Sequence, residues 1–137
     1  MKTIVVAMDG SAPSLKGLQY ALEIAQPTGA RIELIYVSPP VLLPPTVYAA
    51  TIEHIRQAED AHAKEVLGAA AKTVSVECDQ VHLQGPPAEM IADYARNERV
   101  WGVVIGAKGH NALSRVLLGS VAERLMHICP KPVLLVH

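Results

Sequence analysis

The chain has 137 residues, half of them apolar, and a formal net charge of −1 without any cluster of Lys and Arg. This length fits one domain, and this charge provides no basic surface for nucleic acid, so we expect no nucleic-acid partner. The longest apolar runs, such as Val133–Val136, are much shorter than the ~18–20 residues that cross a bilayer, so we expect no membrane insertion.

Cysteine usage and the start of the chain indicate the compartment. Cys78 and Cys129 are isolated in the sequence, and Met1 leads within two residues into an apolar run. Isolated cysteines are typical of reduced thiols inside a cell, and this start lacks the pattern of a signal peptide. We therefore expect a cytoplasmic protein.

Short apolar runs alternate with helical patterns along the chain. The predicted elements, in chain order, are a strand over residues 3–8, a helix from 12 to about 28, a strand over 31–37, an irregular loop over 38–45, a helix over 48–72, a strand from Val74 through Cys78 to Leu83, a helix from 85 to about 97, a strand over 100–105, a helix from Ser114 or Leu117 to Ile128, and a strand over 133–136. This alternation indicates a single α/β domain over residues 1–137, with a mainly parallel sheet and helices on both faces.

The helix over residues 48–72 has one apolar stripe, and the charged residues lie elsewhere on it. The stripe consists of Ile52, Ile55, Ala58, Val66 and Ala69. The loop before this helix, from Ser38 to Pro45, holds four prolines and the run Val41-Leu42-Leu43. Apolar side chains are usually buried, which favours packing of this run on the core. The alternative is a lid over a ligand, and the sequence leaves the role of the loop open.

The carboxyl ends of the strands are the expected place for a ligand. In open parallel sheets, ligands bind there, where the strand order reverses. If the first and fourth strands are neighbours, Asp9 and Gly106 face each other across one crevice. Asp9 is the only acidic residue expected in this crevice. We favour ligand contact for Asp9 over a plain Asp-Gly turn, with coordination of Mg²⁺ through ATP phosphates as a secondary alternative.

A glycine-serine pattern follows the fourth strand. Gly106, Gly109, Gly119 and Ser120 have the spacing G-x2-G-x9-G-S. Glycine lets a backbone approach a bulky anion, and the N–H groups at a helix N-terminus attract that anion. Lys108 would add a positive charge. The alternative for the first two glycines is that they only permit a tight turn.

Other nucleotide and metal motifs are missing from the sequence. A P-loop needs Gly-Lys followed directly by Ser or Thr, and this tripeptide is absent from the sequence. A dinucleotide-binding fingerprint needs several glycines after the first strand, where this chain has only Gly10. The six histidines and two cysteines have no zinc-binding spacing, so we expect no metal bound by protein side chains alone. No Ser-His-Asp arrangement can be assembled either.

The glycine-serine spacing resembles the nucleotide-binding signature of the universal stress protein family. The opening over residues 5–11 (VVAMDGS) and the ending over residues 129–136 (CPKPVLLV) are similar to that family too. The resemblance implies a Rossmann-like, open five-stranded parallel sheet with strand order 3-2-1-4-5, usually a homodimer. In the ATP-binding branch of the family it implies a bound nucleotide.

When the family's site residues are matched by position to this sequence, the resemblance implies a nucleotide-binding site. Ala7 and Asp9 would lie near the adenosine, and Val37 would offer backbone groups to the adenine. The residues that would hold the ribose and phosphates are Gly106, Gly109, Gly119, Ser120 and Val121. Lys108 is expected either to contact a phosphate or to point into solvent.

Together these patterns predict an adenine-nucleotide-binding regulatory protein of the stress response. ATP is the first ligand expected, and AMP or cyclic AMP is the alternative. The apolar strand over 133–136 lies at a sheet edge, so we expect it to pair two copies into a homodimer. A slow ATPase, for which no general base is evident, and a nucleotide-free protein with an unknown protein partner remain as further alternatives.

Overall fold

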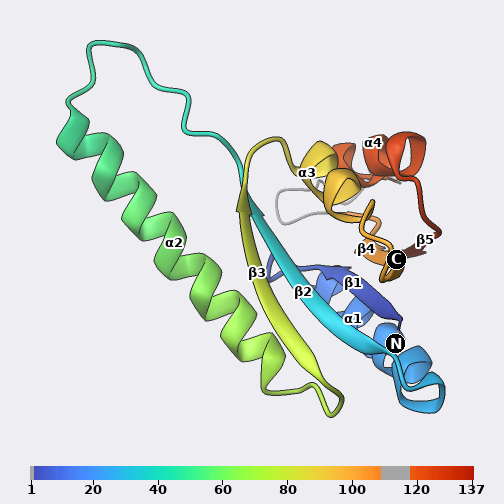
Figure 1. Cartoon of the computed structure of the whole chain (residues 1–137). Helices are drawn as coiled ribbons and strands as arrows, with labels where there is room; N and C mark the ends of the chain where they lie inside the picture. The colour runs from blue at the N-terminus through green and yellow to red at the C-terminus, as the bar shows by residue number, and fades with distance from the viewer. Residues whose placement is uncertain (1, 109–117) are drawn as a thin grey trace.

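A computed structural model of the chain describes residues 2–108 and 118–137. The elements in this part of the chain are β1 (Thr3–Ala7), α1 (Ala12–Thr28), β2 (Arg31–Ser38), α2 (Ala49–Ala71), β3 (Cys78–Gln84), α3 (Pro87–Tyr94), β4 (Val100–Gly106), α4 (Ser120–Ile128) and β5 (Val133–Val136). The five strands form one sheet in the order β3-β2-β1-β4-β5, and every pairing is parallel (Figure 1). The predicted fold class and strand order are therefore confirmed.

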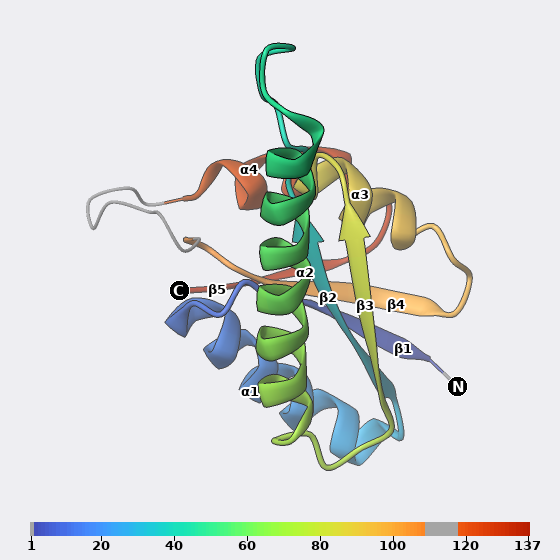
Figure 2. The ribbon, with the colours of Figure 1, turned by 90° about the vertical axis from the view of Figure 1, so that its left-hand side faces the viewer.

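Helices cover both faces of the sheet. Helices α1 and α2 pack on one face and α3 and α4 on the other, as Figures 1 and 2 show. Successive strand residues alternate between the faces, so Val6 lies under α1 and α2 while Val5 lies under α3 and α4. Because both faces are buried, the central strands need the near-continuous apolar runs that the sequence contains.

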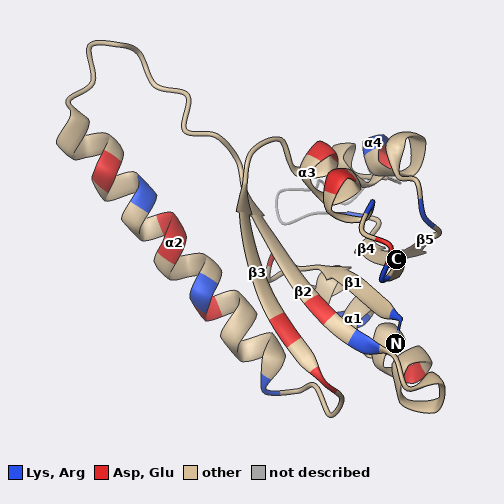
Figure 3. Ribbon diagram, in the orientation of Figure 1, with Lys and Arg blue, Asp and Glu red and all other residues tan. Residues whose placement is uncertain are grey.

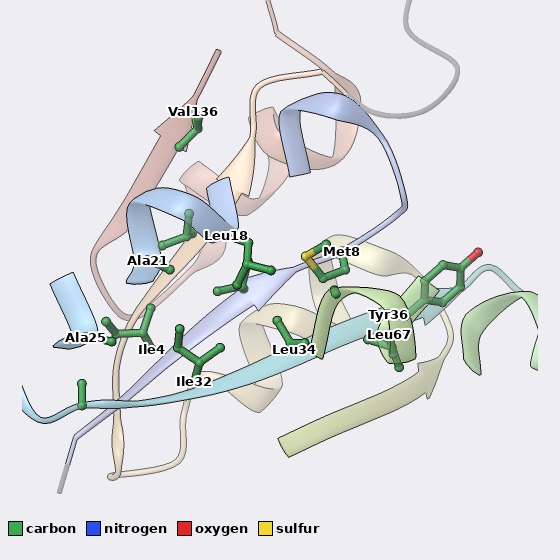
Figure 4. Close-up of a cluster of buried hydrophobic side chains, with 14 of the residues drawn as sticks. Ile4, Met8, Leu18, Ala21, Ala25, Ile32, Leu34, Tyr36, Leu67 and Val136 are labelled. Atoms are coloured by element: carbon green, nitrogen blue, oxygen red, sulfur yellow. The ribbon is translucent and has the colours of Figure 1, made fainter. Parts of the chain in front are cut away.

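The core under α1 follows helical spacing. Leu18, Ala21 and Ala25 are nearly inaccessible to solvent and lie against Ile4 and Ile32 of the sheet (Figure 4). Small alanines at this spacing let the helix axis come close to the strands. The helix ends at Gly29, whose φ of 70° is left-handed, which is typical of a C-cap glycine.

The predicted apolar stripe of α2 is right at Val66, which packs against the core, and wrong at Ala58 and Ala69, which are exposed. The structure buries Ala63, Leu67 and Ala70, all in the C-terminal half of α2, whereas Ile55 is 40 % exposed. The N-terminal half of α2 extends beyond the edge of the sheet and has no strand to pack against (Figure 1). Charged residues of both signs alternate along this helix (Figure 3).

The loop before α2 does not pack on the core as predicted. It runs out past the end of β2 to reach the projecting start of α2 (Figure 1). The side chain of Leu42 is 87 % exposed, and Leu43 and Tyr48 are exposed as well. Only Pro39, at the start of the loop, reaches the cavity described below.

Two predicted element boundaries are wrong, and a third falls outside the described residues. Strand β3 begins at Cys78 instead of Val74, because the N–H of Val74 bonds to the carbonyl of Ala71 in a turn that ends α2. Helix α3 ends at Tyr94 instead of Asn97, since the N–H of Asn97 bonds to the Tyr94 carbonyl, three residues back. Helix α4 begins at Ser120 after an extended Gly119 (φ −70°, ψ 156°), and the expected starts at residues 114 and 117 lie outside the described residues.

One carboxylate is buried near the amino ends of the strands. Glu33 of β2 is 4 % exposed. Its Oε2 accepts a hydrogen bond from the Tyr94 hydroxyl at 2.6 Å, and its Oε1 accepts one from Nε of Arg99 at 3.1 Å. This group lies at the opposite end of the sheet from the cavity, so its role is to hold α3 and the start of β4 on β2.

Within the described residues, none of the helices is long and apolar enough to span a membrane.

Candidate functional site

A cavity of about 690 Å³ lies at the carboxyl ends of β1, β2 and β4. The strand order reverses between β1 and β4, so the cavity occupies the switch point of the sheet. Eight residues that the sequence predicts for the site line this cavity: Ala7, Asp9, Val37, Gly106, Lys108, Gly119, Ser120 and Val121. The ninth, Gly109, lies outside the described residues.

Asp9 forms the turn from β1 into α1. Its Oδ1 accepts a hydrogen bond from the Ser11 N–H at 2.9 Å, and Gly10 takes the positive φ of 83° that the turn requires. Ser11 in turn caps α1, because its Oγ accepts a hydrogen bond from the Ser14 N–H at 3.3 Å. Asp9 therefore has the turn role that the sequence offered as an alternative, and it also lines the cavity.

Gly106 has a structural reason to be glycine. A Cβ placed on it would lie 2.7 Å from Cβ of Pro13 and 3.1 Å from the Pro13 carbonyl carbon. The first turn of α1 thus rests directly on the end of β4. This contact brings the Asp9–Ser11 turn and the end of β4 to the same cavity wall.

The N-terminus of α4 reaches the cavity beside β4. The N–H of Gly119 bonds to the carbonyl of Ala107, which ties the start of α4 to the end of β4. As N-cap, Gly119 has no side chain with which to bond the N–H groups of the first helical turn. Those groups, together with Ser120 and Lys108, give this wall the positive character that an anion needs.

A second wall is apolar and comes from the α3 and α4 side of the sheet. It consists of Ile35, Val37, Ile91, Ile105 and Ala122. Of these, the sequence analysis named only Val37, because the contributions of α3 and α4 depend on how these helices lie across the strands. A flat apolar group would bury its faces here.

A third wall comes from α2 and is polar. This wall is lined by Tyr36, Glu59 and His62, and no pattern in the sequence indicates these residues as part of the site. Glu59 corrects the expectation that Asp9 is the only acidic residue in the crevice. Oε1 of Glu59 accepts hydrogen bonds from the Tyr36 hydroxyl at 3.0 Å and from Oγ of Ser38 at 3.2 Å. Tyr36 lies at the end of the core cluster, with its hydroxyl directed away from Ile32 (Figure 4).

The electrostatics of this third wall are negative. Burial raises the pKa of Tyr36 to about 12, and the hydrogen bond to Glu59 and the negative charges of Glu59 and Asp9 act in the same direction. The phenol is therefore neutral at physiological pH and donates a hydrogen bond to Glu59. Both carboxylates lie close enough to the phenol to act on it.

Metal ligands do not gather anywhere in residues 2–108 and 118–137. No group of three or more His, Cys, Asp or Glu side chains is arranged there to hold a metal ion.

Comparison with known proteins gives one consistent result. A family model described as "Universal stress protein family" matches residues 1–137. Universal stress protein MJ0531 of Methanocaldococcus jannaschii is 35% identical over 98% of this chain and 81% of its own length. A universal stress protein of Thermus aquaticus is 34% identical over 98% of both chains. The structure of universal stress protein UspA from Lactobacillus plantarum has a TM-score of 0.87 and 26% identity, covering 99% of this chain and 97% of that one.

Two further similar structures contain nucleotides. The universal stress protein from Archaeoglobus fulgidus in complex with dAMP has a TM-score of 0.73 and 24% identity, over 100% of this chain and 98% of that one. A universal stress protein in complex with cAMP has a TM-score of 0.70 and 23% identity, over 99% and 97%. At these identities the likeness shows a shared fold.

Proposed function

This chain belongs to the universal stress protein family, and from that membership we propose that it is a cytoplasmic regulatory protein of the stress response that binds an adenine nucleotide. The binding site is the cavity at the carboxyl ends of β1, β2 and β4. The observation that carries the proposal is the meeting of Gly106, Lys108, Gly119 and Ser120 on one wall of a cavity whose other walls suit a nucleoside.

Each wall of the cavity suits one part of the nucleotide. The apolar wall with Val37, Ile91 and Ile105 would bury the adenine, and backbone groups of Val37 would bond its edge. The phosphates would lie at the N-terminus of α4, where Ser120 and Val121 present N–H groups of the first helical turn. The ribose would lie between the two, beside Asp9 and the α2 wall.

Relatives support this choice of ligand class. The A. fulgidus protein holds dAMP and another member of the family holds cAMP, both adenine nucleotides on the same fold. For this chain we propose ATP or AMP. Any Mg²⁺ would be bound chiefly by the ATP phosphates, with Asp9 nearby.

We also propose that the protein acts as a homodimer. Strand β5 is an edge of the sheet, with an unpaired outer side in the described chain, and its Leu134 is 40 % exposed. Pairing of β5 with β5 of a second copy would cover this apolar edge.

Isothermal titration calorimetry of the nucleotide-free protein with ATP and AMP, which measures the heat of binding, tests the proposal. Saturable binding of either nucleotide with one site per chain supports it. Absence of heat from both nucleotides, with a protein shown by circular dichroism to be folded, would overturn it.

A further inference from the structure

Glu59 occupies a position in the cavity that the proposed site leaves unexplained. Its half-buried carboxylate lies on the α2 wall, and its Oε1 already accepts hydrogen bonds from Tyr36 and Ser38. Among the described residues, nothing donates a hydrogen bond to Oε2 of Glu59. A carboxylate accepts but does not donate, so Glu59 can take one more donor from a ligand in the cavity.

The charge of the α2 wall determines which part of a nucleotide can lie against it. Glu59 lies within hydrogen-bond distance of the Tyr36 hydroxyl on this wall, and the carboxylate of Asp9 lines the same cavity. Phosphate oxygens would be repelled from it, whereas hydroxyl groups would be bound as donors. The apolar wall opposite suits the base, and the α4 N-terminus suits the phosphates. The sugar is the part of the nucleotide that remains for the α2 wall.

We propose that Glu59 accepts a hydrogen bond from a ribose hydroxyl and thereby selects nucleotides with a free 2′,3′-diol over 3′,5′-cyclic nucleotides. The inference rests on the proposed function, because it requires an adenine nucleotide in this cavity. In a 3′,5′-cyclic nucleotide the 3′ oxygen is esterified, so the 3′ hydroxyl is lost as a donor and only the 2′ hydroxyl remains. The cyclic phosphate would also lie on the sugar, close to the Glu59 carboxylate.

The neighbours of Glu59 fix the carboxylate for this role. Tyr36 and Ser38 belong to β2, whereas Glu59 belongs to α2, so their hydrogen bonds join the two elements at the cavity edge. Oγ of Ser38 also lies 2.7 Å from Nε2 of His82 on β3. An acceptor held by several partners loses little conformational entropy when it binds a further donor.

The test compares four ligands with three proteins by isothermal titration. The ligands are AMP, 2′-deoxy-AMP, 3′-deoxy-AMP and cyclic AMP, and the proteins are the wild type, Glu59→Gln and Glu59→Ala. Glu59→Gln removes the charge but keeps an oxygen that can accept from Tyr36 and Ser38. Glu53→Gln is the matched control, because it removes the same charge from an α2 glutamate that does not line the cavity.

The proposal predicts that the Glu59 variants lose affinity selectively, for nucleotides that carry the contacted ribose hydroxyl. AMP should bind Glu59→Ala about 10- to 100-fold more weakly than it binds the wild type, with a smaller loss in Glu59→Gln and none in Glu53→Gln. One of the two deoxy nucleotides should bind the wild type and Glu59→Ala almost equally, because it lacks the hydroxyl that Glu59 contacts. Cyclic AMP should bind the Glu59 variants at least as well as the wild type.

Three results would overturn the inference while leaving the proposed function intact. These are unchanged binding of AMP by Glu59→Ala, an equal loss for all four ligands, and the same loss in Glu53→Gln. Failure of every adenine nucleotide to bind the folded wild type would overturn the proposed function and the inference together.

Discussion

Gly106 at the end of β4 and Pro13 in the first turn of α1 are in such close contact that a Cβ on Gly106 would lie 2.7 Å from the Cβ of Pro13. Neither the proline ring nor the backbone beside it can rotate out of the way. This contact sets how near the start of α1 lies to the end of β4, and both segments line the cavity. Gly106 is therefore required by packing, whether or not it also touches a ligand.

The first prediction concerns this contact. Gly106→Ala should lower the free energy of unfolding by about 1–3 kcal/mol, because the methyl group overpacks the junction of α1 and β4. Urea unfolding followed by circular dichroism measures it. Gly68→Ala in α2 is the control, since a Cβ there meets nothing within 4 Å. Equal stability of Gly106→Ala and the wild type would show that α1 can shift away without cost.

The second prediction concerns the buried Glu33. Arg99→Met should destabilise the fold by about 1–2 kcal/mol, because Glu33 keeps its burial but loses the partner at 3.1 Å. The expected loss of stability is modest because the Arg99 side chain is 45% exposed, so that solvent weakens its ion pair with Glu33. The double variant Glu33→Gln, Arg99→Met should recover part of the loss in the same urea experiment. A double variant as unstable as the sum of the two single variants would contradict this coupling.

The third prediction concerns alkaline pH. The pKa of Tyr36 is about 12 in the folded protein, above its ordinary value of 10.0, so the folded state holds this proton longer than the unfolded state does. The resulting stability is fully present below pH 10 and is lost as pH rises from 10 to 12, by about 2 kcal/mol. The difference in unfolding free energy between wild type and Tyr36→Phe should therefore shrink across this window.

Tyrosine absorbance checks the same assignment. The difference in absorbance between the wild type and Tyr36→Phe should titrate near pH 12. An absorbance difference that titrates near the ordinary tyrosine pKa of 10.0 would contradict the buried phenol–carboxylate pair.

The fourth prediction concerns the proposed homodimer. Leu134→Glu should convert a dimer into a monomer in sedimentation velocity, because it places charge on the exposed apolar edge of β5. Leu42→Glu is the control: Leu42 is more exposed, at 87 %, but lies in the loop before α2. If only Leu42→Glu dissociated the dimer, the interface would not lie at β5, and the proposed pairing would be wrong.

Much of the fold follows from local patterns in the sequence. Runs such as residues 3–8 and 100–105 are short, apolar and rich in β-branched residues, which favours buried strands, and the structure has β1 and β4 there. The juxtaposition of Asp9 and Gly106 followed from one assumption, that these two strands are neighbours. The register of β1 against β4 confirms that assumption.

The α2 wall could not be predicted in the same way. Its residues depend on the rotation and tilt of α2 over β2 and β3, which arise from close packing at Ala63, Leu67 and Ala70. The sequence favoured a stripe through the larger Ile52 and Ile55, but the sheet does not extend to that half of the helix. Glu59 lies one helical turn before the buried Ala63, and this position brings its side chain to the cavity.

The most direct test of the proposed nucleotide site is isothermal titration of ATP and AMP into three proteins: the wild type, Gly119→Val and Gly68→Ala. Gly119 has an ordinary φ of −70°, so valine fits the backbone but its side chain would fill the space beside the N-terminus of α4. The account predicts binding by the wild type and Gly68→Ala and its loss in a folded Gly119→Val. Equal binding by all three proteins, or no binding by a folded wild type, would contradict it.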